Sequence, residues 1–297
     1  MRKFRYLSFS DKIFYILVGL LLTAIFIAVL YPCIFVLSAS FSSGSAVQSG
    51  KVFLWPVEFN LEGYKTVFRT PEVWIGFRNS MFYTIASTII SVSMTITAAY
   101  CLSRKDVPGS NAIMLLFTFT MFFSGGMIPN YLLMRNLGFL DTIWAIIIPN
   151  AISAYNLIVA RTFIRNNIPE ELLEAATIDG CSDIGYFVRI VLPLSKAIIA
   201  VLVLFYGVAQ WNSYFNPMIY LNSEELYPLT IFLKEILLAS QIDPSTLSDP
   251  ESAALLIDMA NIIKYALIVV SMIPVMLIYP FVQKYFVKGV MIGSVKG

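Results

Sequence analysis

Six long runs without a charged residue divide this sequence, and they limit its fold more than any other feature. The runs cover residues 13–37, 79–103, 111–134, 142–160, 197–223 and 265–283. A helix needs about 20 apolar residues to cross the roughly 30 Å hydrocarbon core of a bilayer. The runs show little amphipathic striping, which long helices of a soluble protein would need toward water. We therefore expect an all-α integral membrane protein with six transmembrane helices.

The composition supports this expectation and disfavours catalysis. Of the 297 residues, 58% are hydrophobic and 13% are charged, which gives more apolar surface than one soluble core would bury. Histidine is absent, so no imidazole can serve as a general base or a metal ligand. We expect no catalytic residue, no metal site and no cofactor on this chain. Cys33, Cys101 and Cys181 form no CxxC pair, and we interpret them as small apolar side chains.

Lys and Arg are distributed unequally between the two sides of the predicted spans. Six spans put both termini on one side, and that side holds thirteen of the 20 basic residues against seven on the other. Because cytoplasmic loops carry the excess of positive charge, both termini are predicted to be cytoplasmic. The predicted organisation is a first helix with an outer loop in 1–78, a transmembrane core in 79–286 and a cytoplasmic tail in 287–297.

Two outer segments are longer than simple connections require. Residues 38–78 combine Ser, Gly and aromatic residues, which indicates a folded cap or an interfacial stretch rather than a free linker. Residues 224–258 predict a short surface helix after Pro228, which would guard the outer mouth, meet a soluble receptor or act as a plain connection. Lys51 follows a glycine as in a phosphate-binding loop. However, the spacing between this glycine and the preceding one is one residue too long for that motif, and Val52 replaces the required Ser or Thr. ATP hydrolysis is therefore expected in another protein.

The cytoplasmic segment 167–193 is longer than a connection between two helices needs, and its own sequence predicts two helices. Pro169 is suited to open the first helix, and Gly180 supplies a left-handed residue that ends it. Ser182 can cap a second helix, which we expect Pro193 to end before the fifth span begins. The segment should form a compact helical knob.

The charge of this knob favours a protein partner. An amphipathic connector resting on lipid headgroups is the alternative, but such helices are normally rich in Lys and Arg. Here the acidic residues outnumber the basic ones; the acidic residues are Glu170, Glu171, Glu174, Asp179 and Asp183. A partner that presents basic groups suits this surface better than an anionic leaflet does.

The same knob carries the motif of a known family. Glu174-Ala175-Ala176, Asp179-Gly180, Ile190 and Leu192-Pro193 resemble, without a gap in spacing, the EAA loop of ATP-binding-cassette (ABC) importer permeases. The resemblance implies the ABC importer permease fold, with a coupling helix seated in a groove of an ATPase. It also implies that the two alanines permit close packing, that Gly180 permits the turn, and that Glu174 anchors the loop through charge-assisted hydrogen bonds.

Further residues narrow the resemblance to carbohydrate transport. Trp211-Asn212 and the aromatic residues after it resemble the carbohydrate branch of the family, and residues 123–130 and 288–297 resemble its oligosaccharide or polysaccharide subgroup. This likeness implies a sugar importer in the bacterial cytoplasmic membrane. Its other parts would be a second permease, two ATPase subunits that bind ATP and Mg, and an external sugar-binding protein; no nucleic acid is involved.

A sugar requires hydroxyl-matching groups and aromatic faces within the membrane. The candidate pathway residues with these properties are Tyr206, Gln210, Trp211, Asn212, Tyr214 and Asn216. Asn130 and Asn150 are further candidates, because each lies beside a proline where a broken helix would free backbone carbonyls for a cavity; kinks without substrate contact are the alternative there. An interfacial aromatic belt with hydrogen bonds between helices is the alternative interpretation of the group around Trp211. We also expect Gly125-Gly126 and Pro129 to bend the third span.

Other functions fit the sequence less well. The absence of charged residues from all six runs disfavours proton relays and ion coupling, and with them a secondary carrier. An intramembrane enzyme would need a catalytic constellation that the sequence lacks. The same importer class with an amino acid, a peptide or another polar solute as its cargo remains an alternative.

Overall fold

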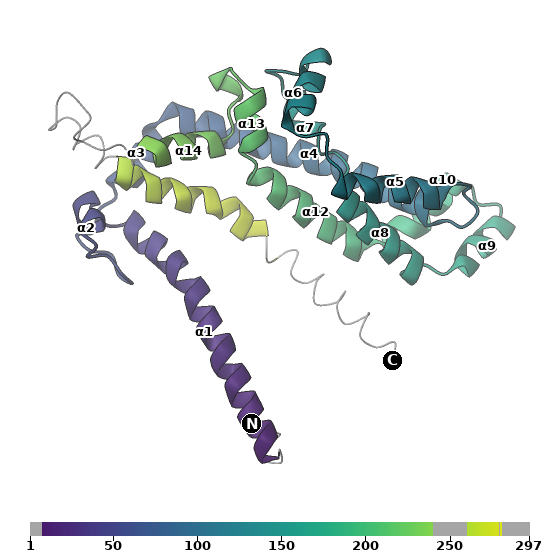
Figure 1. The fold of residues 1–297 in the computed structure, drawn as a ribbon, viewed down its shortest axis with the longest axis horizontal. Helices are drawn as coiled ribbons and strands as arrows, with labels where there is room; N and C mark the ends of the chain where they lie inside the picture. The colour runs from purple at the N-terminus through teal and green to yellow at the C-terminus, as the bar shows by residue number, and fades with distance from the viewer. Residues whose placement is uncertain (1–7, 240–259, 279, 281–297) are drawn as a thin grey trace. The chain divides into compact units, whose positions relative to one another are not determined.

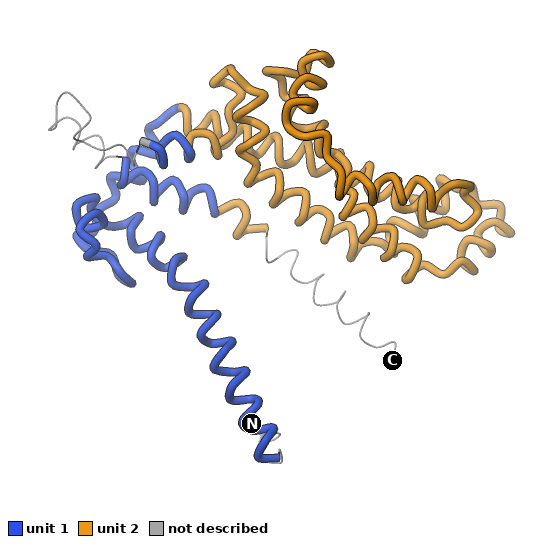
Figure 2. Tube along the Cα trace, viewed as in Figure 1, with its two compact units in different colours: residues 1–71, 233–272 blue, residues 72–232, 273–297 orange. Residues whose placement is uncertain are grey.

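The computed structural model describes residues 8–239, 260–278 and 280, and the regular elements in these residues are all helices (Figure 1). The chain divides into two compact units (Figure 2). Unit 1 contains residues 1–71 and 233–272, and unit 2 contains residues 72–232 and 273–297. The expected all-helical architecture is confirmed for the described part of the chain.

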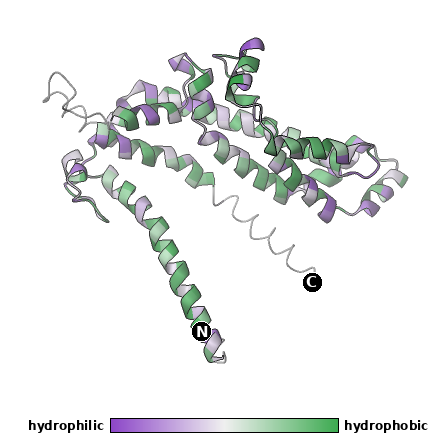
Figure 3. Cartoon of the chain, in the orientation of Figure 1, coloured by the Kyte–Doolittle hydropathy of each residue, from purple (hydrophilic) through white to green (hydrophobic). Residues whose placement is uncertain are grey.

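Unit 1 begins with α1, Phe9–Ser40, a helix of 32 residues. The Ser8 side chain caps it by accepting a hydrogen bond from the Asp11 N–H at 3.2 Å, which satisfies one of the free donors at the start of a helix. Apolar residues follow along nearly its whole length (Figure 3), and none of its most apolar 18-residue stretch is buried within the described structure. Such a surface is suited to lipid.

The segment after α1 is folded, as expected for 38–78. It contains α2, Gly44–Gln48, and α3, Glu62–Arg69. The Val57 N–H donates to Ser42 Oγ at 3.0 Å, and a small apolar cluster is formed by Ala39, Ala46 and Val52. These contacts explain why the segment does not behave as a free linker.

Unit 2 is organised along α4, Pro71–Ser103, a helix of 33 residues. Its core contains the fully buried side chains of Ala99, Leu157, Val191 and Leu202. Small and branched side chains at these positions let α4, α8 and α12 approach one another closely.

The third predicted span is bent, as expected. It consists of α5, Ser110–Phe122, and α6, Met127–Asn136, whose axes differ by 116°. Gly126 lies at the break with a φ of 86°, a conformation that side chains with a Cβ rarely adopt. Pro129 lies in the first turn of α6, where a proline is tolerated.

The fourth predicted span, 142–160, is not a continuous helix. It divides into α7, Trp144–Ile147, and α8, Ala154–Asn167. Pro149 interrupts the run, because proline cannot donate a backbone hydrogen bond and restricts the residue before it. Ser153 then starts a new helix by accepting a hydrogen bond from the Asn156 N–H. The run is therefore divided at the proline beside Asn150 and does not form one continuous helix.

The fifth predicted span, 197–223, is also interrupted. α12, Lys196–Trp211, ends at Asn212, whose side chain donates to the Val208 carbonyl at 2.8 Å. A short helix follows, α13, Phe215–Tyr220. A polar side chain that bonds to its own helix competes with the next backbone hydrogen bond, so the break falls within the Asn-rich stretch.

Asp141 joins the segment after α6 to the segment after α13. Its Oδ1 accepts hydrogen bonds from the N–H groups of Asn222 and Ser223, each at 2.9 Å, and the Ser223 hydroxyl donates to its Oδ2 at 2.6 Å. The Ser223 hydroxyl and then the two N–H groups lower the pKa of Asp141. Stabilising the charged form of a carboxyl group in this way lowers its pKa.

The predicted helix after Pro228 is confirmed as α14, Leu229–Ala239, preceded by the one-turn helix η3, Glu224–Leu226. The rest of the predicted outer loop falls on 240–259, outside the described residues, as does the tail 287–297. Among the described helices, α1, α4 and Ala260–Ile278 are each long and apolar enough to cross a membrane unbroken. Counting each bent pair as one span raises the number of candidate spans to five.

Candidate functional site

The first helix of the knob forms as its sequence predicts. α9, Glu170–Ile178, begins after Pro169 and carries Glu170 and Glu171 in its first turn, where the helix dipole favours negative charge. Gly180 follows the helix with a φ of +74°. The Cys181 N–H bonds to the Ala176 carbonyl at 2.9 Å, and the Gly180 N–H bonds to the Thr177 carbonyl at 3.0 Å. These bonds satisfy carbonyls that the helix end would otherwise leave free.

The second helix begins as predicted but continues beyond its expected end. Ser182 accepts a hydrogen bond from the Gly185 N–H at 3.2 Å and starts α10, Asp183–Tyr186. A π-helical turn, η2, Phe187–Val191, leads into α11, Leu192–Leu194. The helical segment ends at Leu194, one residue beyond the predicted stop at Pro193. The wider π turn accommodates a residue without an N–H, and the chain instead bends by 78° before α12.

The motif residues divide into a buried set and an exposed set. Ala176 is buried in the core of unit 2, and Ile190 and Leu192 pack partly buried against the same core. The exposed residues are Glu174, Ala175, Asp179, Gly180 and Pro193. The first set therefore attaches the knob to its own protein, whereas the second set faces outward and is free to contact another molecule.

Two apolar side chains lie beside this exposed set. Ile178, at the end of α9, is 86% exposed, and Ile184, in α10, is 78% exposed. Large apolar residues this exposed are unfavourable in water, and they commonly mark contact surfaces when they lie together with polar groups. The sequence analysis assigned neither residue to a contact surface; Ile178 would face lipid only in the alternative in which the connector rests on headgroups.

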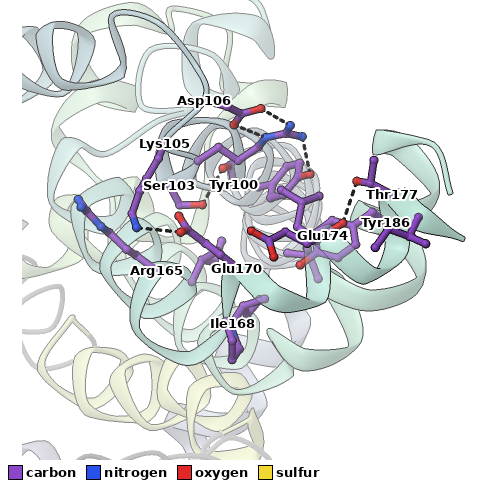
Figure 4. A pocket seen from close by; sticks show the side chains of 16 residues that line it. Tyr100, Ser103, Lys105, Asp106, Arg165, Ile168, Glu170, Glu174, Thr177 and Tyr186 are labelled. Atoms are coloured by element: carbon purple, nitrogen blue, oxygen red, sulfur yellow. Dashed lines mark hydrogen bonds and ion pairs between the residues drawn. The ribbon is translucent and has the colours of Figure 1, made fainter. Parts of the chain in front are cut away.

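A pocket of about 770 Å³ lies between the knob, α8 and the end of α4 (Figure 4). Glu170, Glu174 and Thr177 line it from α9, and Lys105 and Arg165 contribute positive charge. The Lys105 Nζ lies 2.8 Å from Glu170 Oε2, with both side chains more than half exposed. An ion pair this exposed contributes little stability, so the knob depends on other contacts for its position.

Arg104 supplies a stronger contact. Its guanidinium donates to Asp183 Oδ1 at 2.5 Å, to the Tyr100 hydroxyl at 3.2 Å and to both carboxylate oxygens of Asp106. Only 18% of the Arg104 side chain is exposed, and the hydrogen bonds that it donates to Asp106 (the larger effect) and to Asp183 raise its pKa. In the sequence analysis, Arg104 counted only among the basic residues that set the orientation in the membrane. The signal that was missed is the pair of adjacent basic residues, Arg104 and Lys105, in a chain that also carries an acidic cytoplasmic loop.

Tyr206, a candidate pathway residue, is buried and bonded within the protein. Its hydroxyl lies 2.7 Å from Thr95 Oγ1 and accepts a hydrogen bond from the Ser153 N–H at 3.0 Å. These contacts join α12 to α4 and to the start of α8. Tyr206 therefore has a structural role whatever its relation to a substrate.

The other candidate pathway residues are spread over several elements. Trp211 is buried edge-on against Phe77, with ring centroids 5.9 Å apart, and it lines an apolar pocket of about 440 Å³. The remaining members have partly or fully exposed side chains and lie on α12, in the turn after it, on α13, on α6 and in the connection before α8; they are Gln210, Asn212, Tyr214, Asn216, Asn130 and Asn150. The structure of this chain does not gather all eight residues around one cavity.

Comparison with known proteins gives consistent results over most of the chain. Residues 73–292 match the family described as binding-protein-dependent transport system inner membrane component. The polygalacturonan/rhamnogalacturonan transport system permease protein YtcP of Bacillus subtilis is 43% identical, over 97% of this chain and 100% of the relative. The arabinooligosaccharides transport system permease protein AraQ of Halalkalibacterium halodurans is 28% identical over 92% of each chain.

A solved structure is similar as well. It is a crystal structure of a bacterial ABC transporter involved in the import of the acidic polysaccharide alginate. The similarity has a TM-score of 0.84 and 36% sequence identity, and it covers 95% of this chain and 99% of the other. At this level of identity and coverage, the two chains share their fold along nearly their whole length.

Proposed function

The chain belongs to the family of binding-protein-dependent transport system inner membrane components, and we propose that segment 167–193 couples it to an ATPase. The protein is a multi-pass permease subunit of an ABC importer in the inner membrane, with a transport role rather than a catalytic one. The family implies an importer complex around it. The exposed set of the knob, with Glu174 at its centre, is the observation that supports the coupling role.

We propose that the importer contains the subunits that the family resemblance implies. This chain would pair with a second permease, two ATPase subunits that bind ATP and Mg, and an external sugar-binding protein. Six spans would place both termini in the cytoplasm, with a first helix and outer loop in 1–78, the permease core in 79–286 and a tail in 287–297. The pathway would run between the two permeases, which is consistent with candidate pathway residues that this chain alone does not bring together.

The substrate that we propose is an oligosaccharide. The similar proteins include one named for polygalacturonan and rhamnogalacturonan and one named for arabinooligosaccharides. The similar crystal structure concerns an acidic polysaccharide, which makes an acidic oligosaccharide the more specific candidate. Another polar solute is the alternative, and competition for uptake between neutral and acidic oligosaccharides would separate these cases.

The coupling role is tested by ATP-dependent uptake into vesicles that contain the complete importer. Glu174→Lys should abolish most uptake while the protein still inserts, because it reverses the charge at the proposed anchor. Glu72→Lys is the control: it makes the same charge change at an exposed residue in the first turn of α4, away from the knob. Uptake that needs no ATP, or equal loss in both variants, would contradict the proposal.

A further inference from the structure

α4 is the longest helix of unit 2, and it has specific partners at both ends. Its 33 residues extend about 50 Å at about 1.5 Å per residue, which exceeds the roughly 30 Å hydrocarbon core. Its two ends therefore emerge on opposite sides of the membrane. Unlike the pairs α5–α6 and α11–α12, which bend by 116° and 78°, α4 crosses without interruption.

At the inner end of α4, the coupling knob is held by an aromatic and ionic cluster. Arg104, the residue directly after α4, bonds to Asp183 in α10. The Tyr100 ring lies 5.0 Å from the Phe187 ring and 6.3 Å from the Tyr186 ring, measured between centroids. These contacts fix the second helix of the knob to α4, independently of the chain connection through α12.

At the outer end, α4 holds the segment that contains η3. The Asn79 side chain donates to the Glu225 carbonyl at 2.7 Å and to the Tyr227 carbonyl at 3.1 Å. The Tyr83 hydroxyl donates to the Leu226 carbonyl at 2.9 Å, and the Leu229 N–H donates to Ser80 Oγ at 2.9 Å. Four hydrogen bonds along little more than one turn attach this outer segment to the same rigid helix.

We propose that Arg104 is a positioning residue that transfers movement of the coupling knob to α4, and through α4 to the outer segment 225–229. The proposal rests on the coupling function of 167–193. The knob has two covalent connections, one through Ser195, where the chain bends before α12, and one through Ile168 and Pro169 to α8, which is separated from α7. Both transmit displacement less directly than a helix with continuous backbone hydrogen bonds. Arg104 binds both Asp183 in the knob and Asp106 in its own loop, so its preference between the two can differ between importer states.

The test is a double-mutant cycle in the reconstituted importer, measured as uptake and as ATP hydrolysed per sugar imported. Asp183→Asn removes the charge of one Arg104 partner with little change of shape, and Asn79→Ala removes two outer hydrogen bonds. Each change should lower uptake by about tenfold and raise the ATP used per sugar. Lys65→Gln, which breaks an exposed ion pair on α3, is the control and should change neither quantity.

The double variant decides between transmission and local damage. If Asp183 and Asn79 both act through α4, breaking the route at both places does no more than breaking it once. Uptake by the double variant should then equal uptake by whichever single variant transports less. Independent sites this far apart give multiplying effects, about a hundredfold here, and that result would overturn the proposal, as would an unchanged ATP-to-sugar ratio. Arg104→Lys and Tyr83→Phe replace the first pair if either variant fails to assemble. A wild-type importer without ATP-dependent uptake would instead reject the coupling function itself.

Discussion

Replacing Gly180 with alanine should weaken binding of the ATPase without disturbing the rest of the fold. At a φ of +74°, a residue with a Cβ costs about 1–2 kcal/mol relative to glycine. No heavy atom lies within 4 Å of the position that the new Cβ would take, so the cost comes from the backbone alone. If docking requires this turn, 1–2 kcal/mol corresponds to a loss of about 5- to 30-fold in affinity.

The assay is binding of the purified permease to its ATPase, with thermal unfolding measured in parallel. Gly180→Asn should lose less affinity than Gly180→Ala, because asparagine tolerates left-handed backbone. Gly138→Ala is the matched control: Gly138 has a φ of +70° and no heavy atom near the position of a new Cβ, but it lies after α6, away from the knob. It should lower stability by a similar amount and leave the affinity unchanged.

Two results would refute this reasoning. Equal loss of affinity in Gly180→Ala and Gly138→Ala would mean that general destabilisation, not the geometry of the turn, weakens docking. An alanine variant with wild-type affinity and lower stability would mean that the ATPase recognises the exposed side chains without requiring the turn.

Three further predictions concern other parts of unit 2. Tyr206→Phe should lower stability by about 1–3 kcal/mol, because it removes the partner of the buried Thr95 hydroxyl and of the partly buried Ser153 N–H; an altered KM with unchanged stability would contradict its structural role. Asp141→Asn should lower the unfolding temperature near neutral pH. The difference should vanish as pH falls below about 4, since the pKa of Asp141 is lowered by Ser223 and the stability of the charged form is lost through that range. Ala176→Leu should destabilise the protein by about 1–3 kcal/mol through overpacking, whereas Ala175→Leu should keep stability and reduce ATPase binding.

The knob was the part of the fold most fully predictable from sequence, because local chemistry determines it. Pro169 at the helix start, Gly180 after its end and Ser182 as a cap each act through bonds to residues within a few positions along the chain. Such effects need no knowledge of tertiary structure. The bend at Gly126 was predictable for the same reason.

The interruption of the fifth predicted span was not found, and that of the fourth was anticipated only from the proline beside Asn150, because hydropathy reports how apolar a run is and not whether its backbone is continuous. Pro149 follows three isoleucines, where window averages conceal it, whereas Asn212 lies among polar and aromatic residues, and hydropathy does not report their effect on the backbone. Arg104 was missed for a different reason. Its partner Asp183 lies 79 positions away in the chain, and one sequence does not show which distant charges meet.

The bare surface of α1 has a consequence for how the protein is made. A helix that satisfies its own backbone hydrogen bonds and carries apolar side chains is stable in lipid without neighbours. Because none of its most apolar stretch is buried in the described structure, α1 can leave the insertion machinery as soon as it has been synthesised. It would then hold the growing chain at the membrane. Interrupted elements such as α5–α6 and α12–α13 have free helix ends that need hydrogen-bond partners, so they would become stable in lipid only after the rest of the chain has been synthesised.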